Sequence, residues 1–172
     1  AINIGLNGQY APWVGALLDA KKTLLLITSE GKETEAVLRL ARVGYENVKG
    51  ILSGGIAAWR ASGREVFVTK SITAKEFTEQ HLNYSILDVR NAGEWNGGVL
   101  ENAHLIALAN LEKEMPMLNK HTPYYVHCAG GYRSMMAVSM MNRAGFENVT
   151  NIKGGMGKIK ESGAALVQPT FA

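Results

Sequence analysis

The residues best suited to chemistry lie in one short stretch around the only cysteine of the chain, Cys128. Glycines follow it at positions 130 and 131, and Arg133 and Ser134 come next. Glycines allow successive backbone N–H groups to point into one small space, where they can bind an anion. A thiol beside such donors and a fixed cation ionises more readily than a free thiol. We therefore predict a nucleophilic cysteine at the rim of an anion-binding loop.

The residues on either side of this loop predict a strand before it and a helix after it. Tyr124–His127 is apolar and prone to β structure, and the run from Met135 to Met141 suits a helix. The positive end of that helix dipole favours an anion in the loop. We expect Arg133 to hold the charge of a donor or acceptor, and the loop backbone to bind the anion through Ala129, Gly130, Gly131, Tyr132 and Ser134.

A lone cysteine is also commonly a small buried hydrophobic residue. The residues that follow Cys128 argue against that interpretation here. Glycines, Arg133 and Ser134 directly after a strand are poor choices for a packed core and good ones for a loop that holds an anion. The context therefore favours catalysis.

Four motifs together resemble the rhodanese (sulfurtransferase) family over about residues 72–165. They are Cys128–Ser134, Asp88-Val89-Arg90, Glu94-Trp95 and Asn151–Met156. The resemblance implies an α/β domain with a parallel sheet and helices on both of its faces. It also implies that Cys128 becomes a persulfide, taking a sulfane sulfur from thiosulfate or a low-molecular-weight persulfide and passing it to a thiophilic acceptor.

The same loop is similar to the protein-tyrosine-phosphatase signature, which places five residues between cysteine and arginine. Here there are four, so the loop is tighter. A sulfane sulfur is one atom, whereas a phosphoryl group needs donors around three oxygens. The spacing therefore favours sulfur transfer over a phosphatase or an arsenate reductase. A third alternative is a persulfide carrier or docking module without turnover.

Three charged residues upstream are expected to support the loop rather than react. Asp88 and Arg90 end the predicted strand Ile86–Arg90, and the carboxyl ends of parallel strands face the ligand in open α/β sheets. We predict an ion pair of Arg90 with Glu94 or Asp88 that fastens the neighbouring loop. Gly97-Gly98-Val99 departs from the Gly-His-Ile step of the family.

The histidines give no basis for a metal site. His104, His121 and His127, taken with Cys128, fit no zinc spacing, so we predict no metal and no cofactor in this sequence. His127 precedes the nucleophile on the predicted strand and is expected to face the opposite side of the sheet. It is a weak candidate for a general base.

An internal repeat indicates two copies of one unit. Residues 41–48 return as residues 142–149, and Gly54-Gly55-Ile56 returns as Gly154-Gly155-Met156. The first copy has no cysteine, and Ile27, Thr28 or Ser29 replaces it, depending on where a gap is placed. Glu30 adds negative charge to that loop. We predict a catalytically inactive first domain over residues 1–66 and an active rhodanese domain over residues 67–172.

The first copy is also shortened. Because Ala1–Ile4 aligns with Ala103–Ile106, the counterpart of residues 72–102 is missing. We expect a sheet with an open edge and an uncovered apolar face. Either the native chain continues upstream, or a neighbouring subunit fills the gap. The arrangement, with residues 2–13, resembles the C-terminal part of persulfide dioxygenase-rhodanese fusions, which implies an upstream metallo-β-lactamase-type domain that holds iron.

Several further elements follow from apolar periodicity. Helices are expected over residues 10–20, 34–43 and 54–63, and a short strand over residues 48–52. Residues 64–72 form the expected linker. Thr73 and Glu76 have the spacing of a capping box, which predicts a helix start.

Composition limits the remaining function classes. The formal charge of +3 comes from 18 basic and 15 acidic residues without a basic run, which argues against nucleic-acid binding. A single cysteine excludes an internal disulfide and suits a reducing compartment. No signal peptide or apolar membrane span is evident, so we expect a cytoplasmic protein. The expected partners are small sulfur donors and thiol acceptors, and a homo-oligomer stays open.

Overall fold

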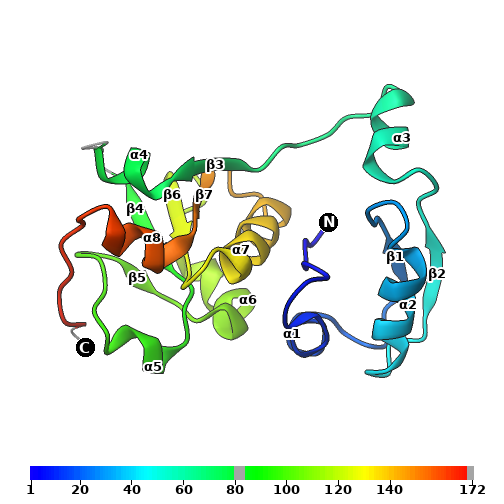
Figure 1. Ribbon diagram of the computed structural model, residues 1–172, viewed down its shortest axis with the longest axis horizontal. Coiled ribbons are helices and arrows are strands. Elements are labelled where there is room, and N and C mark those ends of the chain that lie inside the picture. Colours follow the sequence, from blue (N-terminus) through cyan, green and yellow to red (C-terminus); the bar gives the residue numbers. More distant parts are fainter. Residues whose placement is uncertain (80–83, 170–172) are drawn as a thin grey trace. The chain divides into compact units, whose positions relative to one another are not determined.

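The computed structural model describes residues 1–79 and 84–169 of the chain (Figure 1). The chain forms two compact units, residues 4–68 and the part from Thr69 onward. Ala1–Asn3 groups with the second unit, where the backbone N–H of Asn3 donates to Ser139 Oγ at 2.9 Å. No helix of the described segments combines the length and hydrophobicity that a membrane span requires.

The second unit is built on a parallel sheet. Among its described residues, five strands lie in the order β3-β7-β6-β4-β5, and every neighbouring pair runs parallel. The strands are β3 (Lys70–Thr73), β4 (Ser85–Asp88), β5 (His104–Leu105), β6 (Tyr124–His127) and β7 (Val149–Lys153). In such a sheet the segments that follow β4 and β6 meet at one edge, where the predicted site residues lie.

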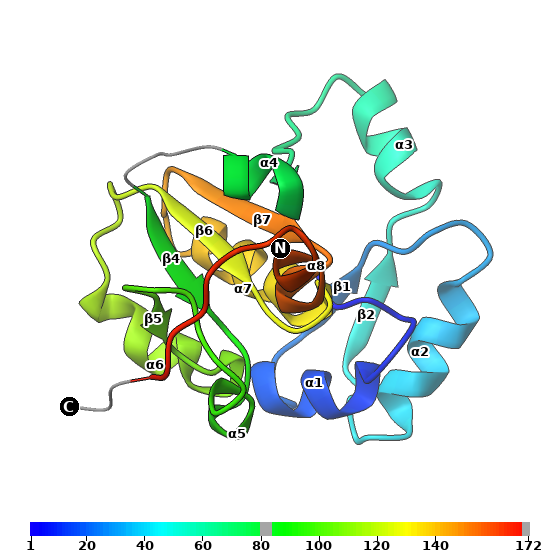
Figure 2. The same ribbon diagram turned by 60° about the vertical axis from the view of Figure 1, so that its left-hand side comes forward.

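Helices cover both faces of this sheet, with α8 on one face and α7 on the other (Figures 1 and 2). The helical elements are α4 (Ala74–Glu79), α5 (Ala92–Trp95), η1 (Leu108–Asn110), α6 (Leu111–Glu114), η2 (Met115–Met117), α7 (Tyr132–Arg143) and α8 (Gly155–Glu161). Parallel sheets are found almost only with both faces covered in this way. The predicted parallel α/β architecture is confirmed.

The start of α4 is the predicted capping box. The backbone N–H of Glu76 donates to Thr73 Oγ1 at 3.1 Å, and the backbone N–H of Thr73 donates to Glu76 Oε2 at 2.7 Å. These two bonds satisfy backbone donors that the first helical turn leaves without partners. The linker is shorter than predicted, because β3 begins at Lys70.

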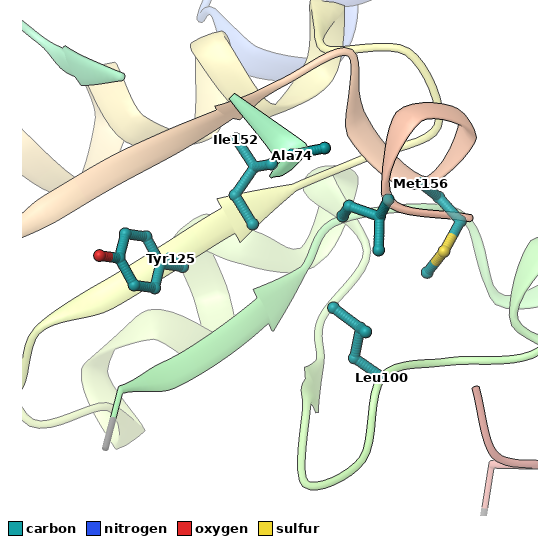
Figure 3. Close-up of a cluster of buried hydrophobic side chains, with 6 residues drawn as sticks. Ala74, Leu100, Tyr125, Ile152 and Met156 are labelled. Atoms are coloured by element: carbon teal, nitrogen blue, oxygen red, sulfur yellow. The ribbon is translucent and has the colours of Figure 1, made fainter. Parts of the chain in front are cut away.

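An apolar cluster between the sheet and α8 fixes that helix in place (Figure 3). Its buried members are Ala74, Leu100, Tyr125, Ile152, Met156 and Ile159, with Phe77 and Tyr84 packed against them. Tyr125 makes edge-to-face contacts with both of these rings. The cluster joins α4, β6, β7 and α8, and thereby sets the position of the N-terminus of α8.

The first unit contains a smaller set of elements. Strands β1 (Leu24–Leu26) and β2 (Val48–Ile51) pair in parallel, and the helices are α1 (Tyr10–Leu17), α2 (Glu33–Ala41) and α3 (Gly55–Ala61). The predicted elements are present with small shifts at their ends. Their core consists of Tyr10, Val14, Leu40 and Tyr45. The Tyr45 hydroxyl donates to the Leu18 carbonyl at 2.6 Å and ties α1 to the end of α2.

The opposite side of this small sheet lacks a cover. Leu25 is 78% exposed and Ile56 is 45% exposed, and α3 has no buried residue. In the internal repeat, Ile56 is equivalent to Met156, which is only 4% exposed in the second unit. In that unit the residues of β3 and α4 cover the equivalent positions. The first unit therefore exposes apolar surface of the kind that the second unit buries.

This difference predicts unequal effects of two matched substitutions. Met156→Ala removes buried atoms and should destabilise the second unit by about 2–5 kcal/mol, whereas Ile56→Ala should cost the first unit less than about 1 kcal/mol. Hydrogen exchange of the β7 and β2 amides, measured separately, reports the two free energies of opening. Equal losses would contradict an exposed position for Ile56.

Candidate active site

Cys128 directly follows strand β6 and lies at the carboxyl ends of the sheet strands. All four residues of this strand are buried, and α7 begins only four residues after the cysteine, at Tyr132. Between them lie Ala129 and Gly130, which are exposed, and Gly131, which is half-buried. The segment is therefore the strand, loop and helix that the sequence predicts.

The sulfur accepts a hydrogen bond from the loop backbone. The Gly131 N–H donates to Cys128 Sγ at 3.1 Å, and Ser134 Oγ lies 3.7 Å from the sulfur. The Ser134 hydroxyl donates in turn to the Gly131 carbonyl at 3.1 Å. Gly131 has φ +99°, which favours glycine, and a Cβ there would lie 3.3 Å from the Gly154 nitrogen. The loop backbone thus supplies one hydrogen-bond donor to the sulfur.

The predicted position of Cys128 at the rim of the loop is wrong. The residue is only 1% exposed, and its sulfur lies at the floor of the loop. The cause is local, because the bond from Gly131 and the contact with Ser134 turn the side chain inward.

The N-terminus of α8 holds the loop from behind. The Met156 N–H donates to the Cys128 carbonyl at 2.7 Å, and the Gly157 N–H donates to the Ala129 carbonyl at 3.1 Å. Gly155 has φ +57°, and a Cβ there would lie 2.8 Å from the Ala129 carbonyl carbon and would also clash with the Cys128 carbonyl oxygen. The predicted site does not include Gly155. The repetition of Gly54-Gly55 as Gly154-Gly155 is the sequence feature that could have identified it.

Arg133 is paired with Glu94. Its Nη1 and Nη2 donate to the two oxygens of the Glu94 carboxylate at 2.5 and 2.8 Å. These hydrogen bonds lower the pKa of Glu94, and the same contact raises the pKa of Arg133. The alternative that Arg90 pairs with the Glu94 carboxylate is wrong, because Arg133 of α7 reaches it instead. Glu94 also accepts from the Asn91 N–H at 2.9 Å and so caps α5.

Arg90 pairs with Asp88, which was the other predicted partner. Both residues are buried, and Arg90 Nε and Nη2 donate to Asp88 Oδ2 at 2.9 and 2.6 Å. The same guanidinium donates to the carbonyls of Glu94 and Gly98 at 3.2 and 2.9 Å. Because a buried charge needs such partners, this pair fixes the segment that carries Glu94.

His127 lies beneath the loop in a buried position. Burial lowers its pKa, which keeps the ring neutral at pH 7. Its Nε2 is 3.8 Å from Asp88 Oδ2, and its Nδ1 lies 3.4 Å from the Cys128 carbonyl. These contacts assign His127 to packing behind the loop rather than to proton transfer at sulfur.

In the first unit, Thr28 occupies the position that Cys128 has in the second. Leu26 pairs with Ile51 and Val126 pairs with Asn151, so both loops leave the sheet in the same register. Gly55 has φ +57° like Gly155, and a Cβ on it would lie 2.8 Å from the Thr28 carbonyl oxygen. Of the three candidates, the structure therefore selects Thr28.

Within residues 1–79 and 84–169, no group of three or more histidine, cysteine, aspartate and glutamate side chains could hold a metal ion. His121 pairs instead with Glu147 at 3.0 Å, and the His104 ring contacts Tyr124.

A family model described as "Rhodanese-like domain" matches residues 73–162, which is more than half of the chain. The chain belongs to the rhodanese-like domain family. The match covers α4, strands β4 to β7, the Cys128 loop and α8, and it includes β3 only at Thr73. The first unit lies outside it.

Similar proteins give the same assignment. A rhodanese-related protein from Thermoplasma volcanium is 31% identical, with a TM-score of 0.55 over 58% of this chain and 99% of its own. Two proteins of Bacillus subtilis are similar over the rhodanese region. YtwF, named as a sulfurtransferase, is 29% identical over 54% of this chain and 88% of its own length. YrkF, named as a sulfur carrier protein, is 33% identical over 48% of this chain, but the match spans only 44% of YrkF.

The contact behind the loop predicts that Gly155 cannot be replaced. Gly155→Ala should destabilise the second unit by more than about 2 kcal/mol, because left-handed backbone strain and a clash with the Cys128 and Ala129 carbonyls add together. Alkylation of Cys128 by iodoacetamide should change in rate as the loop shifts. Gly163→Ala is the matched control, since Gly163 has φ +83° with no atom near the Cβ position. Similar effects of both substitutions would exclude the clash.

Proposed function

We propose that this protein is a sulfurtransferase that works through a Cys128 persulfide. It takes a sulfane sulfur from thiosulfate or a low-molecular-weight persulfide and passes it to a thiophilic acceptor. The observation that carries the proposal is the hydrogen bond of 3.1 Å from the Gly131 N–H to Cys128 Sγ, in a loop with four residues between cysteine and arginine. The similarity to a protein named "Putative sulfurtransferase YtwF" supports sulfur transfer.

The reaction has two displacements at sulfur. The Cys128 thiolate attacks the outer sulfur of thiosulfate, a new S–S bond forms, and the S–S bond of the donor breaks so that sulfite leaves with the electron pair. A thiolate or cyanide then attacks the outer sulfur of the persulfide. The Cys128 thiolate leaves with its electron pair, and the product is a new persulfide or thiocyanate. No external oxidant or reductant is needed.

The loop stabilises negative charge in each intermediate. The Gly131 amide already donates to the sulfur, and the helix dipole of α7 points at the same position. We propose that the amides of residues 129–132 and 134 bind the persulfide anion. Asp88, Arg90 and Glu94 hold the loop and Arg133 in place. A phosphatase or arsenate reductase is disfavoured, because the tighter loop offers less room for a tetrahedral oxyanion.

A carrier without multiple turnover is the alternative that a specific observation favours. The observation is the similarity to a protein of Bacillus subtilis that is named "Putative sulfur carrier protein YrkF". A carrier would form the persulfide and release it to a partner protein, but turn over cyanide and glutathione poorly. Steady-state assays with both acceptors distinguish the two functions.

We also propose that residues 4–68 form a degenerate rhodanese copy in a longer cytoplasmic protein. Thr28 in place of a cysteine and the uncovered side of β1 and α3 support this proposal. In that protein an upstream dioxygenase domain would supply the iron, and the rhodanese unit would exchange sulfur with thiols that the dioxygenase uses. Sequencing the region upstream of this chain tests the arrangement.

Incubation with thiosulfate, followed by intact mass measurement, tests the proposed reaction directly. We expect a gain of one sulfur atom that is reversed by cyanide. Cys128→Ser should show no gain, and Ser53→Ala, a substitution at an exposed residue of the first unit, should behave like the parent protein. The same measurement is made with the persulfide of 2-mercaptoethanol as donor. An unmodified mass in the parent protein with both donors, or a gain that persists in Cys128→Ser, would overturn the proposal.

A further inference from the structure

We infer that Glu94 sets the donor selectivity of the cysteine loop by neutralising Arg133. The loop then favours sulfur donors of low negative charge, such as persulfides of small uncharged thiols, over the thiosulfate dianion. This inference rests on the proposed sulfur transfer and names the substrate class of that site.

The geometry leaves Arg133 little capacity for an anionic ligand. Two of its guanidinium nitrogens donate to the two Glu94 oxygens at 2.5 and 2.8 Å, so the fork of the guanidinium is occupied. The Arg133 side chain is 14% exposed and that of Glu94 is 34% exposed. A dianion that binds Arg133 in the same bidentate way must therefore displace the carboxylate or approach it closely.

The Glu94 carboxylate is held at this position from its own side. It accepts from the Asn91 N–H in the capping box, and Arg90 binds the Glu94 carbonyl at 3.2 Å. Arg90 is fixed in turn by the buried carboxylate of Asp88. Glu94 is therefore preorganised toward Arg133 before any ligand arrives, and swinging it away would break the cap of α5.

Other charged side chains near the loop also have partners. Asp88 and Arg90 compensate each other, and Lys158 near Gly154 pairs with Glu161 at 2.6 Å. Lys160 reaches the Gly97 carbonyl at the end of α5. The Glu94–Arg133 pair includes a residue of the segment Cys128–Ser134. Removing the Glu94 carboxylate should thus make the net charge beside the donor-binding site more positive by one elementary charge.

Alkylation of Cys128 reports the electrostatic potential at the sulfur without any transfer of sulfur. Iodoacetate is an anion and iodoacetamide is neutral, but the two are close in size, and the chain has one cysteine. The ratio of their rates, iodoacetate over iodoacetamide, should rise about tenfold in Glu94→Gln. The glutamine oxygen can still accept from the Asn91 N–H, so α5 keeps its cap. Glu147→Gln is the matched control at an exposed carboxylate paired with His121, and its ratio should not change.

Donor kinetics test the substrate class itself. The ratio of kcat/KM for thiosulfate over kcat/KM for the persulfide of 2-mercaptoethanol should rise about tenfold in Glu94→Gln. It should fall by a similar factor in Arg133→Gln, where Glu94 loses its cation. The double variant Glu94→Gln/Arg133→Gln has the net charge of the parent protein, so its ratio should return close to the parent value. A pair that only braces the loop would give no such restoration.

The outcomes separate this inference from the proposed function. An alkylation ratio that is unchanged in Glu94→Gln, or donor ratios that move together in all three variants, would overturn the role of Glu94. A parent protein that transfers sulfur from neither donor, while the alkylation ratio still responds to Glu94→Gln, would overturn the proposed function instead. Circular dichroism melting confirms that the variants are folded, and the opposite shifts of the two single variants cannot arise from a common loss of structure.

Discussion

The site depends on the contact between the cysteine loop and the N-terminus of α8. The amides of Met156 and Gly157 bind the carbonyls of Cys128 and Ala129, so these carbonyls point away from the sulfur. With the carbonyls turned outward, the Gly131 amide is free to point at Cys128 Sγ. Only a residue without a side chain allows this approach, because any Cβ at Gly155 would occupy the space of the loop backbone. Anion binding here is thus a property of backbone packing.

Two ion pairs then place charge around that backbone. The Asp88–Arg90 pair is buried, and the cost of desolvating both charges offsets most of their attraction. The pair therefore positions the neighbouring backbone more than it adds to the free energy of folding. Its guanidinium donates to the carbonyls of Glu94 in α5 and of Gly98 after it, and so holds that helix in place. Glu94 thereby meets Arg133 from an element that is already fixed. The charge of the loop arginine is set by a neighbouring segment, not by the loop itself.

The sequence predicts the local features of this site better than its contacts. The strand at Tyr124–His127 follows from β propensity and the capping box at Thr73 from spacing, because both depend on neighbouring residues. The partner of Glu94, Arg133, lies 39 residues away on another element. The sequence alone cannot tell whether Arg90 or Arg133 pairs with Glu94, because both carry the same charge. The burial of Cys128 and the choice of Thr28 also depend on tertiary packing. The β1–β2 register shifts between Leu24 and Leu25, which no composition signal reveals.

The first unit has the same glycine arrangement as the active loop but no cysteine. Gly55 keeps φ +57° and the close approach to the preceding loop, although a threonine stands where the thiol would be. The constraint on this glycine therefore comes from packing a helix N-terminus against a strand end, and it holds without catalysis. What differs is the side chain at the reactive position, where Thr28 replaces Cys128. Glu30 adds negative charge to the first loop, which opposes anion binding there, just as the charge of Glu94 is proposed to limit it in the second. This parallel ties the selectivity of the site to carboxylates beside a common backbone arrangement.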